Sequence, residues 1–386
     1  MGSPMKIIVA ADSFKGSMTS DEAGTVIADA MRESLIDTEI LVIPVADGGE
    51  GTTDAVVRAT GGEMRSAIVT GPLGEEVNAH FGLLPGGRIA VMEMASASGF
   101  ELIPVGKLNP MKATTYGTGE LIRAALDEGV QEIILGIGGS ATVDGGIGMA
   151  QALGYRVLTE DGSECGLGGE ALLSIATIQS EKVAPTLAGC RIRVACDVTN
   201  PLLGERGAAR VFGPHKGATP RMVELLEVGL DNLAKVWLNE GRLISVDAPG
   251  DGAAGGLGAA LRAFCGAEMS SGAALVADIC GFDDEIRDAG VLVTGEGRTD
   301  DQTAGGKLCA VLAAKAKAAG ARTILISGAL NGDLRDVDSL FDAVFAAVQD
   351  VCSLDEAIRN GRENLSRTAR SVGRVLAMTQ TIKETE

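Results

Sequence analysis

The sequence has few aromatic residues, only two histidines and no long hydrophobic run. Aromatic residues make up 3% of the 386 residues, and the histidines are His80 and His215. Small aliphatic side chains must therefore fill the core, and a histidine-rich metal site is excluded. No apolar run reaches the ~20 residues that a membrane helix needs, and no signal peptide is visible. We therefore expect no membrane partner.

Basic residues are also scarce. The chain has 33 Lys and Arg against 52 Asp and Glu, which gives a net charge of −19. A nucleic-acid-binding protein needs a stripe of positive charge to displace counterions from phosphates. We therefore expect no nucleic-acid partner, and a phosphorylated ligand would need local cations or Mg²⁺ at its site.

The seven cysteines form no metal-binding or disulfide pattern. Their number is odd, and no two of them are spaced as C-x-x-C. This favours free thiols in a reducing compartment, so we expect a cytoplasmic location. The sequence leaves the oligomeric state open, and a homodimer is one outcome.

Glycine is in excess, with 54 residues, roughly twice the usual ~7% share. The glycines separate apolar runs that alternate with helical patterns, which indicates parallel sheets covered by helices. Residues 63–94 differ, because short alternating runs and Gly-Pro turns predict antiparallel hairpins there. Later strands are expected near residues 132–137, 191–195, 243–246, 291–294, 323–327 and 343–346.

The pattern predicts an α/β fold with two α/β domains. One is a doubly wound, mostly parallel sheet built from both chain ends, residues 1–74 and 289–386. The other is inserted and covers residues 75–288. Seven polar glycine loops follow the predicted strands, where open α/β sheets bind ligands. They are DSFKGS (12–17), DGGEGT (47–52), GIGGSATVDGG (136–146), CDVTNP (196–201), GPHKGA (213–218), GDGAAGGLG (250–258) and TGEGRTDDQT (294–303).

The loop at residues 136–146 has two interpretations. Its amides would face an anion at a helix start, which favours a phosphate loop. The string GIGGSA also matches the dinucleotide fingerprint, with Glu160 at about the right distance, so a nicotinamide-dependent dehydrogenase is an alternative. Gly145 and Gly146 fall where the fingerprint helix should already run. A P-loop is absent because Leu308 follows Gly306-Lys307, so ATP would bind by another scheme.

Charged residues inside these loops are the candidates for chemistry. Asp197 ends a strand and could bind Mg²⁺ or take a proton from a hydroxyl. Asp47 and Glu50 share one loop and offer the carboxylates that Mg²⁺ prefers. Lys15 and Arg298 could hold phosphate or carboxylate. The alternative for each is a turn, a helix cap or a surface charge.

As an ordered set, the motifs resemble the bacterial glycerate kinase type 1 family, the glycerate 2-kinases. They are ADSFKGS, PVADGGEGTTDA, VTGPLGEEVNA, GTGELI, GIGGSATVDGG, QALG, ACDVTNPLLG, FGPHKGA, DGAAGGLGAAL and VTGEGRTDDQT. The resemblance implies a two-domain α/β enzyme that uses ATP and Mg²⁺ to phosphorylate D-glycerate at the 2-hydroxyl. The products would be 2-phospho-D-glycerate and ADP.

The resemblance implies that Asp197 is catalytic or metal-linked, and that Lys15, Ser13 and Arg298 meet the substrate or the transferring phosphate. The full set of predicted site residues comprises catalytic Asp197, Lys15 and Arg298; substrate-binding Asp12, Ser13, Asn200, Gly295 and Glu296; nucleotide- or phosphate-binding Gly138, Gly139, Ser140, Asp144, Lys216, Gly255 and Gly256; and metal-binding Asp47, Glu50 and Asp197.

The sequence departs from the family pattern at three places. Ala11 stands where Pro is usual, Val143 where Asn is usual, and Leu308-Cys309 where a small residue and Pro are usual. These departures keep a kinase of a related small sugar acid open as an alternative. A non-catalytic protein that binds or senses the same ligand is another.

Overall fold

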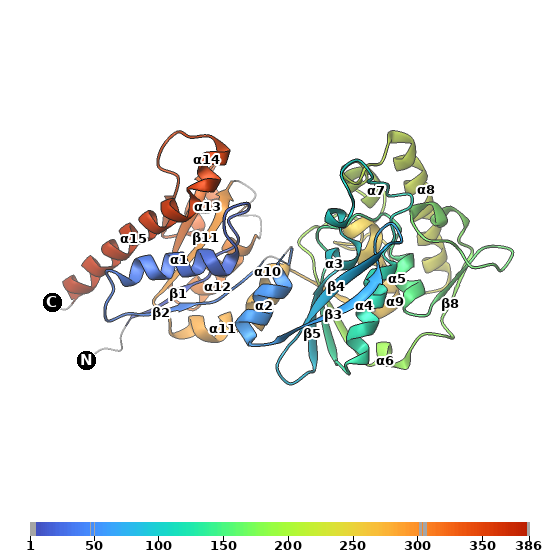
Figure 1. The fold of residues 1–386 in the computed structure, drawn as a ribbon, viewed down its shortest axis with the longest axis horizontal. Helices are drawn as coiled ribbons and strands as arrows, with labels where there is room; N and C mark the ends of the chain where they lie inside the picture. The colour runs from blue at the N-terminus through green and yellow to red at the C-terminus, as the bar shows by residue number, and fades with distance from the viewer. Residues whose placement is uncertain (1–4, 47, 50, 301–302, 304–306, 384–386) are drawn as a thin grey trace. The chain divides into compact units, whose positions relative to one another are not determined.

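The structure is a computed structural model that describes residues 5–46, 48–49, 51–300, 303 and 307–383, with side chains to residue 378. The chain forms two compact units (Figure 1). Unit 1 comprises Met1–Asp47, Arg58–Thr60 and Ala273–Glu386, and unit 2 comprises Gly48–Val57 and Gly61–Gly272. Among the described residues, no helix has both the length and the apolar character that a membrane crossing requires.

Unit 1 contains a five-stranded sheet in the order β13-β12-β11-β1-β2, and all of its pairings are parallel. Strands from both chain ends lie side by side in it (Figure 1). The strands are β1 (Lys6–Val9), β2 (Glu39–Val42), β11 (Val291–Thr299), β12 (Arg322–Leu330) and β13 (Ala343–Ala346). The helices are α1 (Ser20–Arg32), α10 (Gly272–Ile279), α11 (Phe282–Glu285), α12 (Leu308–Ala318), α13 (Arg335–Leu340), α14 (Leu354–Arg359) and α15 (Gly361–Lys383), with η5 (Ile286–Asp288).

Helices cover both faces of this sheet, because successive strand residues point to opposite sides. Ile7 and Val9 of β1 pack with α1 and α15. Ile8, on the other face, packs with residues of α10, α11 and α12, including Phe282. A capping box starts α1, where the Thr19 hydroxyl accepts from the Glu22 amide at 3.3 Å. The doubly wound parallel sheet built from both chain ends is therefore confirmed.

Unit 2 contains a six-stranded sheet in the order β10-β9-β6-β5-β4-β3. Its strands are β3 (Glu63–Thr70), β4 (Glu76–Leu83), β5 (Ile89–Glu93), β6 (Glu132–Gly136), β9 (Arg191–Ala195) and β10 (Glu268–Ser270), and β7 (Arg156–Leu158) pairs separately with β8 (Thr177–Gln179). β5, β6, β9 and β10 run parallel, whereas β3, β4 and β5 pair antiparallel. The hairpins predicted within residues 63–94 are confirmed.

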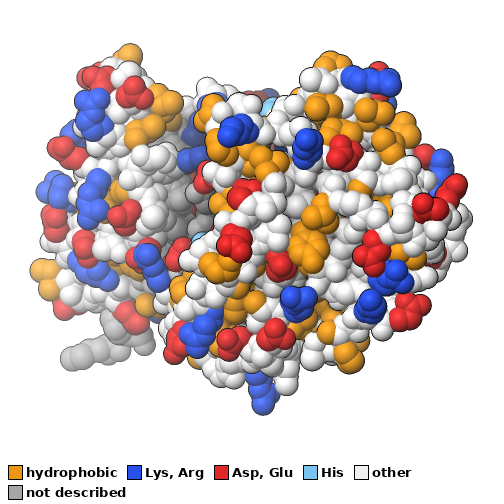
Figure 2. All heavy atoms as spheres, turned by 45° about the vertical axis from the view of Figure 1, so that its right-hand side comes forward, with side chains coloured by type: hydrophobic (Ala, Val, Ile, Leu, Met, Phe, Trp, Pro, Cys, Tyr) orange, Lys and Arg blue, Asp and Glu red, His pale blue; other side chains and the backbone are white. Residues whose placement is uncertain are grey.

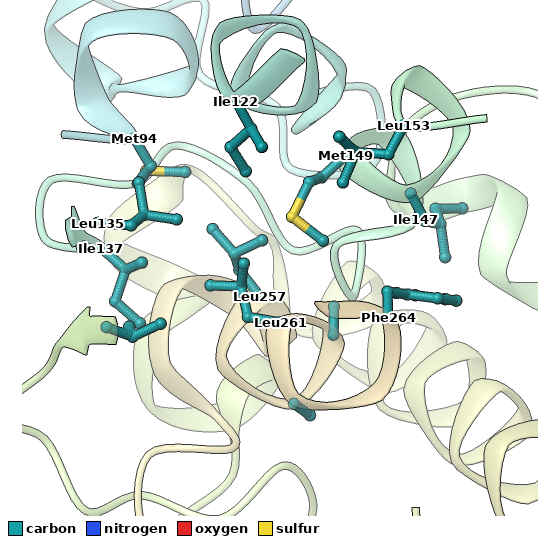
Figure 3. Close-up of a cluster of buried hydrophobic side chains, with 14 of the residues drawn as sticks. Met94, Ile122, Leu135, Ile137, Ile147, Met149, Leu153, Leu257, Leu261 and Phe264 are labelled. Atoms are coloured by element: carbon teal, nitrogen blue, oxygen red, sulfur yellow. The ribbon is translucent and has the colours of Figure 1, made fainter. Parts of the chain in front are cut away.

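The helices of unit 2 include α2 (Thr52–Thr60), most of which belongs to it. The others are α3 (Ala95–Ser98), α4 (Tyr116–Asp127), α5 (Ile147–Ala152), α6 (Pro185–Ala188), α7 (Ala208–Phe212), α8 (Pro220–Asn239) and α9 (Leu257–Cys265), with the 3-10 turns η1 (Phe100–Leu102), η2 (Gly169–Ser174), η3 (Pro214–Lys216) and η4 (Ala253–Gly256). Aliphatic side chains of α4, α5, α9 and β6 meet Met94 and Met149 in the core (Figure 3).

The strand expected at residues 243–246 does not form; Leu243 and Val246 are buried as part of a loop after α8. β3 pairs with β4 along its whole length, and both strands lie in unit 2. The domain limits remain a prediction.

Candidate functional site

In unit 2, glycine loops pack against one another beyond the carboxyl ends of β6 and β9. A Cβ atom added to Gly136 would lie 2.6 Å from the Gly48 carbonyl oxygen, and one on Gly48 would lie 2.9 Å from the Ala195 Cβ. A Cβ on Gly255 would lie 2.0 Å from the carbonyl oxygen of Thr142. Any larger side chain would separate these backbones, so the glycines allow three loops to converge at one sheet edge.

The loop at residues 136–146 presents two exposed glycines, Gly138 and Gly139. Gly139 has a φ of +71°, which favours glycine, and its carbonyl accepts from the Phe100 amide at 3.0 Å. α5 begins only at Ile147. The dinucleotide fingerprint requires its helix to begin inside the motif, so the GIGGSA string does not have that geometry. An accessible glycine backbone at a sheet edge is still suited to a phosphate group.

Lys216 lies beneath this loop. Its Nζ donates to Ser140 Oγ at 3.0 Å and to the Thr142 carbonyl at 2.7 Å. The residue is 8% exposed, and burial lowers the pKa of its ammonium group to about 7, although the negative charge of Asp144 opposes this shift. Ser140 is itself buried. The two residues therefore hold the loop from inside, and their predicted contact with a nucleotide stays a prediction.

Asp144 is fully buried and ties the same loop to the start of α4. It accepts from the amide and hydroxyl of Thr115, both at 2.8 Å, and from the Gly146 amide at 3.0 Å. Burial raises the pKa of its carboxyl, and these hydrogen bonds oppose the rise. Gly255 and Gly256 are likewise buried, with φ values of +70° and +95°. These three residues set the shape of the loop, and their predicted role at a nucleotide remains untested.

Asp197 and Asn200 follow β9. Asp197 is exposed, and its Oδ1 accepts from the Gly272 amide at 3.0 Å. The Asn200 side chain donates to the Arg206 carbonyl at 2.8 Å. An exposed carboxylate fixed at a strand end has the character of a Mg²⁺ ligand or a proton acceptor. The predicted metal residues Asp47 and Glu50 lie outside the described residues, within which no group of three metal-binding side chains occurs.

In unit 1, the DSFKGS loop lies against β11. The Asp12 amide donates to the Gly295 carbonyl at 2.7 Å, and the Ser13 amide donates to Asp12 Oδ1 at 2.7 Å. A Cβ on Gly297 would lie 3.3 Å from the Lys15 amide nitrogen. Lys15 is exposed. The structure therefore brings Asp12, Ser13 and Lys15 together with β11, and their predicted contact with a substrate or a phosphate stays a prediction.

Glu296 and Arg298 lie in the C-terminal half of β11. Glu296 is buried and accepts from the hydroxyls of Thr299 at 2.7 Å and Thr303 at 2.9 Å; burial raises the pKa of its carboxyl. Arg298 is 62% exposed and lies 3.8 Å from Asp300. Lys307 lies 3.7 Å from the same carboxylate. Exposed ion pairs contribute little free energy, so the side chains of Arg298 and Lys307 can leave the Asp300 carboxylate and bind an incoming anion.

Sequence reasoning missed Glu93. It ends β5, is 8% exposed, and accepts from the amides of Thr53 at 2.8 Å and Gly51 at 3.4 Å, at the start of α2. Burial raises the pKa of its carboxyl. The carboxylate thereby fixes the loop that precedes α2 beside β6, since Glu93 pairs with Gly136. An acid that ends an apolar strand is the signal that singled out Asp197, and it applies here as well.

The outer surface carries mixed charge. On the face shown in Figure 2, Lys and Arg side chains are dispersed among acidic and neutral ones and form no continuous stripe. The cations described above instead lie in or beside the glycine loops. Parallel sheets with such loops at their carboxyl edges define an α/β protein suited to binding small anionic ligands.

Comparison with known proteins specifies the class further. Residues 7–377 match the model of the glycerate kinase family, and the chain belongs to that family. Glycerate 2-kinase of Escherichia coli (strain K12) is 45% identical over 375 residues, which cover 97% of this chain and 98% of that protein. Glycerate kinase of Halalkalibacterium halodurans is 46% identical, with 95% and 97% covered.

A solved structure is also similar. The crystal structure of a protein assigned as glycerate kinase 2 from Salmonella typhimurium LT2 superposes with a TM-score of 0.89 at 46% identity, and the match covers 98% of this chain and all of that one. The family resemblance that the ordered motifs carried is therefore confirmed. The two-part α/β architecture agrees with that of the solved relative.

Proposed function

We propose that this chain transfers a phosphoryl group from ATP to the 2-hydroxyl of D-glycerate, giving 2-phospho-D-glycerate and ADP. The observation that carries the proposal is 45% identity with a glycerate 2-kinase across 97% of the chain. The glycine loops and the cations beside them support it, because phosphoryl transfer needs positioning and charge neutralisation more than covalent chemistry.

The residues of unit 2 receive the following roles. The exposed amides of Gly138 and Gly139 bind phosphate oxygens, and Lys216, Ser140 and Asp144 hold those amides in position. Asp197 accepts the proton of the attacking hydroxyl or contributes to a Mg²⁺ site, where the ion would neutralise charge on the phosphates. An exposed carboxylate suits either role. Asp47 and Glu50 are the further candidate ligands.

The residues of unit 1 bind the charged groups of the substrates. Lys15 and Arg298 are exposed cations and neutralise the transferring phosphate or the substrate carboxylate. Asp12 and Ser13 lie beside Lys15 and bind the substrate hydroxyls. Buried Glu296 accepts from the hydroxyls of Thr299 and Thr303, and its predicted contact with the substrate stays a prediction. We further propose a cytoplasmic location, with a monomer or a homodimer as the functional form.

A coupled assay tests the proposal. The purified chain is given ATP and Mg²⁺ with D-glycerate, L-glycerate or small sugar acids, and ADP release is followed. Adding enolase reports the position of phosphorylation, because enolase acts directly on 2-phosphoglycerate and not on the 3-phospho isomer. We expect turnover with D-glycerate and an immediate enolase signal. Turnover confined to another acid, or a signal that requires a phosphoglycerate mutase, would contradict the proposal.

A further inference from the structure

Four arginines line an open groove of about 530 Å³ where α14 ends and α15 begins. Arg359 ends α14, and the other three lie on α15. The arginines are Arg359, Arg362, Arg367 and Arg370, and the remaining lining residues are Asn360, Glu363 and Ser366. No motif that indicated a phosphoryl-transfer site includes any of these residues.

Two of the four guanidinium groups already have partners. Arg370 binds Glu33 through two bonds of 2.6 and 2.9 Å, and Arg367 donates to Gln349 at 2.8 Å. Among the described residues, Arg359 and Arg362 form no ion pair within 4.0 Å. The charge of Arg362 adds to the lowering of the pKa of Glu22, which comes mainly from hydrogen bonds to Thr19. Two exposed guanidinium groups are therefore available to an anion.

The local charge is opposite to that of the whole protein. Residues 359–374 contain five arginines and one acidic residue, in a chain whose net charge is −19. Arg362 and Arg370 are eight residues apart on α15, which corresponds to about 12 Å along the helix. Both residues line the groove, so an anion with two charged groups can place one group at a free arginine and the other at a paired one. Arginine binds phosphate and carboxylate through two parallel hydrogen bonds, which favours these groups over chloride.

The groove is connected to the DSFKGS loop. Ser17 Oγ donates to the Ile358 carbonyl at 2.9 Å, one residue before Arg359. A Cβ on Gly16 would lie 3.5 Å from Ile358 Cδ1, and one on Gly361 would lie 2.3 Å from Ser17 Oγ. The loop that carries Lys15 therefore packs closely on the segment that joins α14 to α15.

We propose that this groove is a second anion site, which binds a small phosphate-bearing anion with at least two charged groups. Arg359 and Arg362 supply the primary contacts, and Arg367 and Arg370 extend the site along α15. Binding restrains the segment around Ile358 and, through Ser17, the loop that carries Lys15. The groove and the DSFKGS loop then respond together to one ligand.

Hydrogen exchange with mass spectrometry tests this on the full chain without ATP. Pyrophosphate and 3-phosphoglycerate are the two probes, at constant ionic strength. We expect slower exchange in peptides covering residues 354–370 and 12–18 with at least one probe. Each probe is titrated, and its Kd is taken from the concentration that slows exchange by half of the full effect. The probe with the lower Kd shows whether the site prefers a polyphosphate or a phosphorylated acid. No change at residues 354–370 with either probe would overturn the site, and a change there without one at residues 12–18 would overturn the link.

Matched variants separate a specific site from general charge attraction. The double variant R359Q/R362Q removes two charges inside the groove, whereas R322Q/R335Q removes two exposed charges elsewhere in unit 1. We expect the first to weaken binding about tenfold and the second to leave it within twofold. Equal weakening by both variants would refute the site. Turnover in the absence of added probe should stay unchanged in both variants, which shows that they are folded.

Discussion

Removing the charge of Lys216 gives a stability change whose pH dependence follows from the structure. The Lys216→Met variant keeps the aliphatic stem but loses the Nζ that donates to Ser140 and Thr142. Two effects oppose each other. The Thr142 carbonyl loses a donor in the interior, which costs about 1–3 kcal/mol. The variant also avoids burying an ammonium group, and burial lowers the pKa of that group from 10.5 to about 7 in the folded protein.

The sign of the pH effect follows from proton binding. Between pH 7 and 10.5 the unfolded chain holds the Lys216 proton more fully than the folded chain, so wild-type stability rises with pH in that window. A group with these two pKa values raises the free energy of unfolding by roughly 2 kcal/mol between pH 7 and pH 9. Below pH 7 both states are protonated and this contribution becomes constant. Lys216→Met lacks the slope, so the wild type should gain stability over the variant as pH rises.

Urea unfolding at pH 7 and pH 9, followed by tryptophan fluorescence, measures this difference. Trp237 is the one tryptophan of the sequence and is fully buried in unit 2, so its emission reports on the unit that contains Lys216. Lys235→Met is the control, because Lys235 is exposed on α8 of the same unit and pairs with Asp231. An equal wild-type-to-variant difference at both pH values would refute a buried lysine with a lowered pKa.

Three further changes have defined outcomes. Asp197→Asn should lower kcat by about 10²–10⁴-fold with an unchanged melting temperature if Asp197 assists proton transfer, as steady-state kinetics and calorimetry would show. Glu93→Ala should destabilise the chain by about 1–3 kcal/mol in urea titrations, because two amides at the start of α2 lose their acceptor, and Glu93→Gln should recover part of the loss. Gly255→Ala should cost several-fold more than Gly266→Ala in the same titrations; both glycines have positive φ, but only at Gly255 would the Cβ meet a backbone oxygen.

The sequence alone predicts the fold class, because the patterns that indicate strands and helices are local. Alternating apolar runs predict strands, and the parallel arrangement follows from their alternation with helices. β3 shows the limit of this reasoning. The length of a hairpin strand is visible in the sequence, but the sheet that it joins depends on pairing with β4, which decides the unit to which it belongs.

The individual site residues were harder to assign, and the two lysines of the glycine loops show why. Lys15 in FKGS and Lys216 in HKGA have nearly the same local sequence, a cation followed by glycine after a polar turn. Lys15 is exposed and can contact an anion. Lys216 is buried under the loop of residues 136–146 and donates its hydrogen bonds to Ser140 and Thr142 of that loop.

The difference between the two lysines arises from the other segments of unit 2. Lys216 is buried against the loop of residues 136–146, and the buried turn at residues 253–256 packs on the same loop at Gly255 and Thr142, more than 100 residues apart in sequence. Desolvation then lowers the pKa of Lys216, and no property of the motif itself carries that information. A motif therefore identifies which side chains can bind charge, but only tertiary burial decides whether that charge faces a ligand or the protein's own backbone.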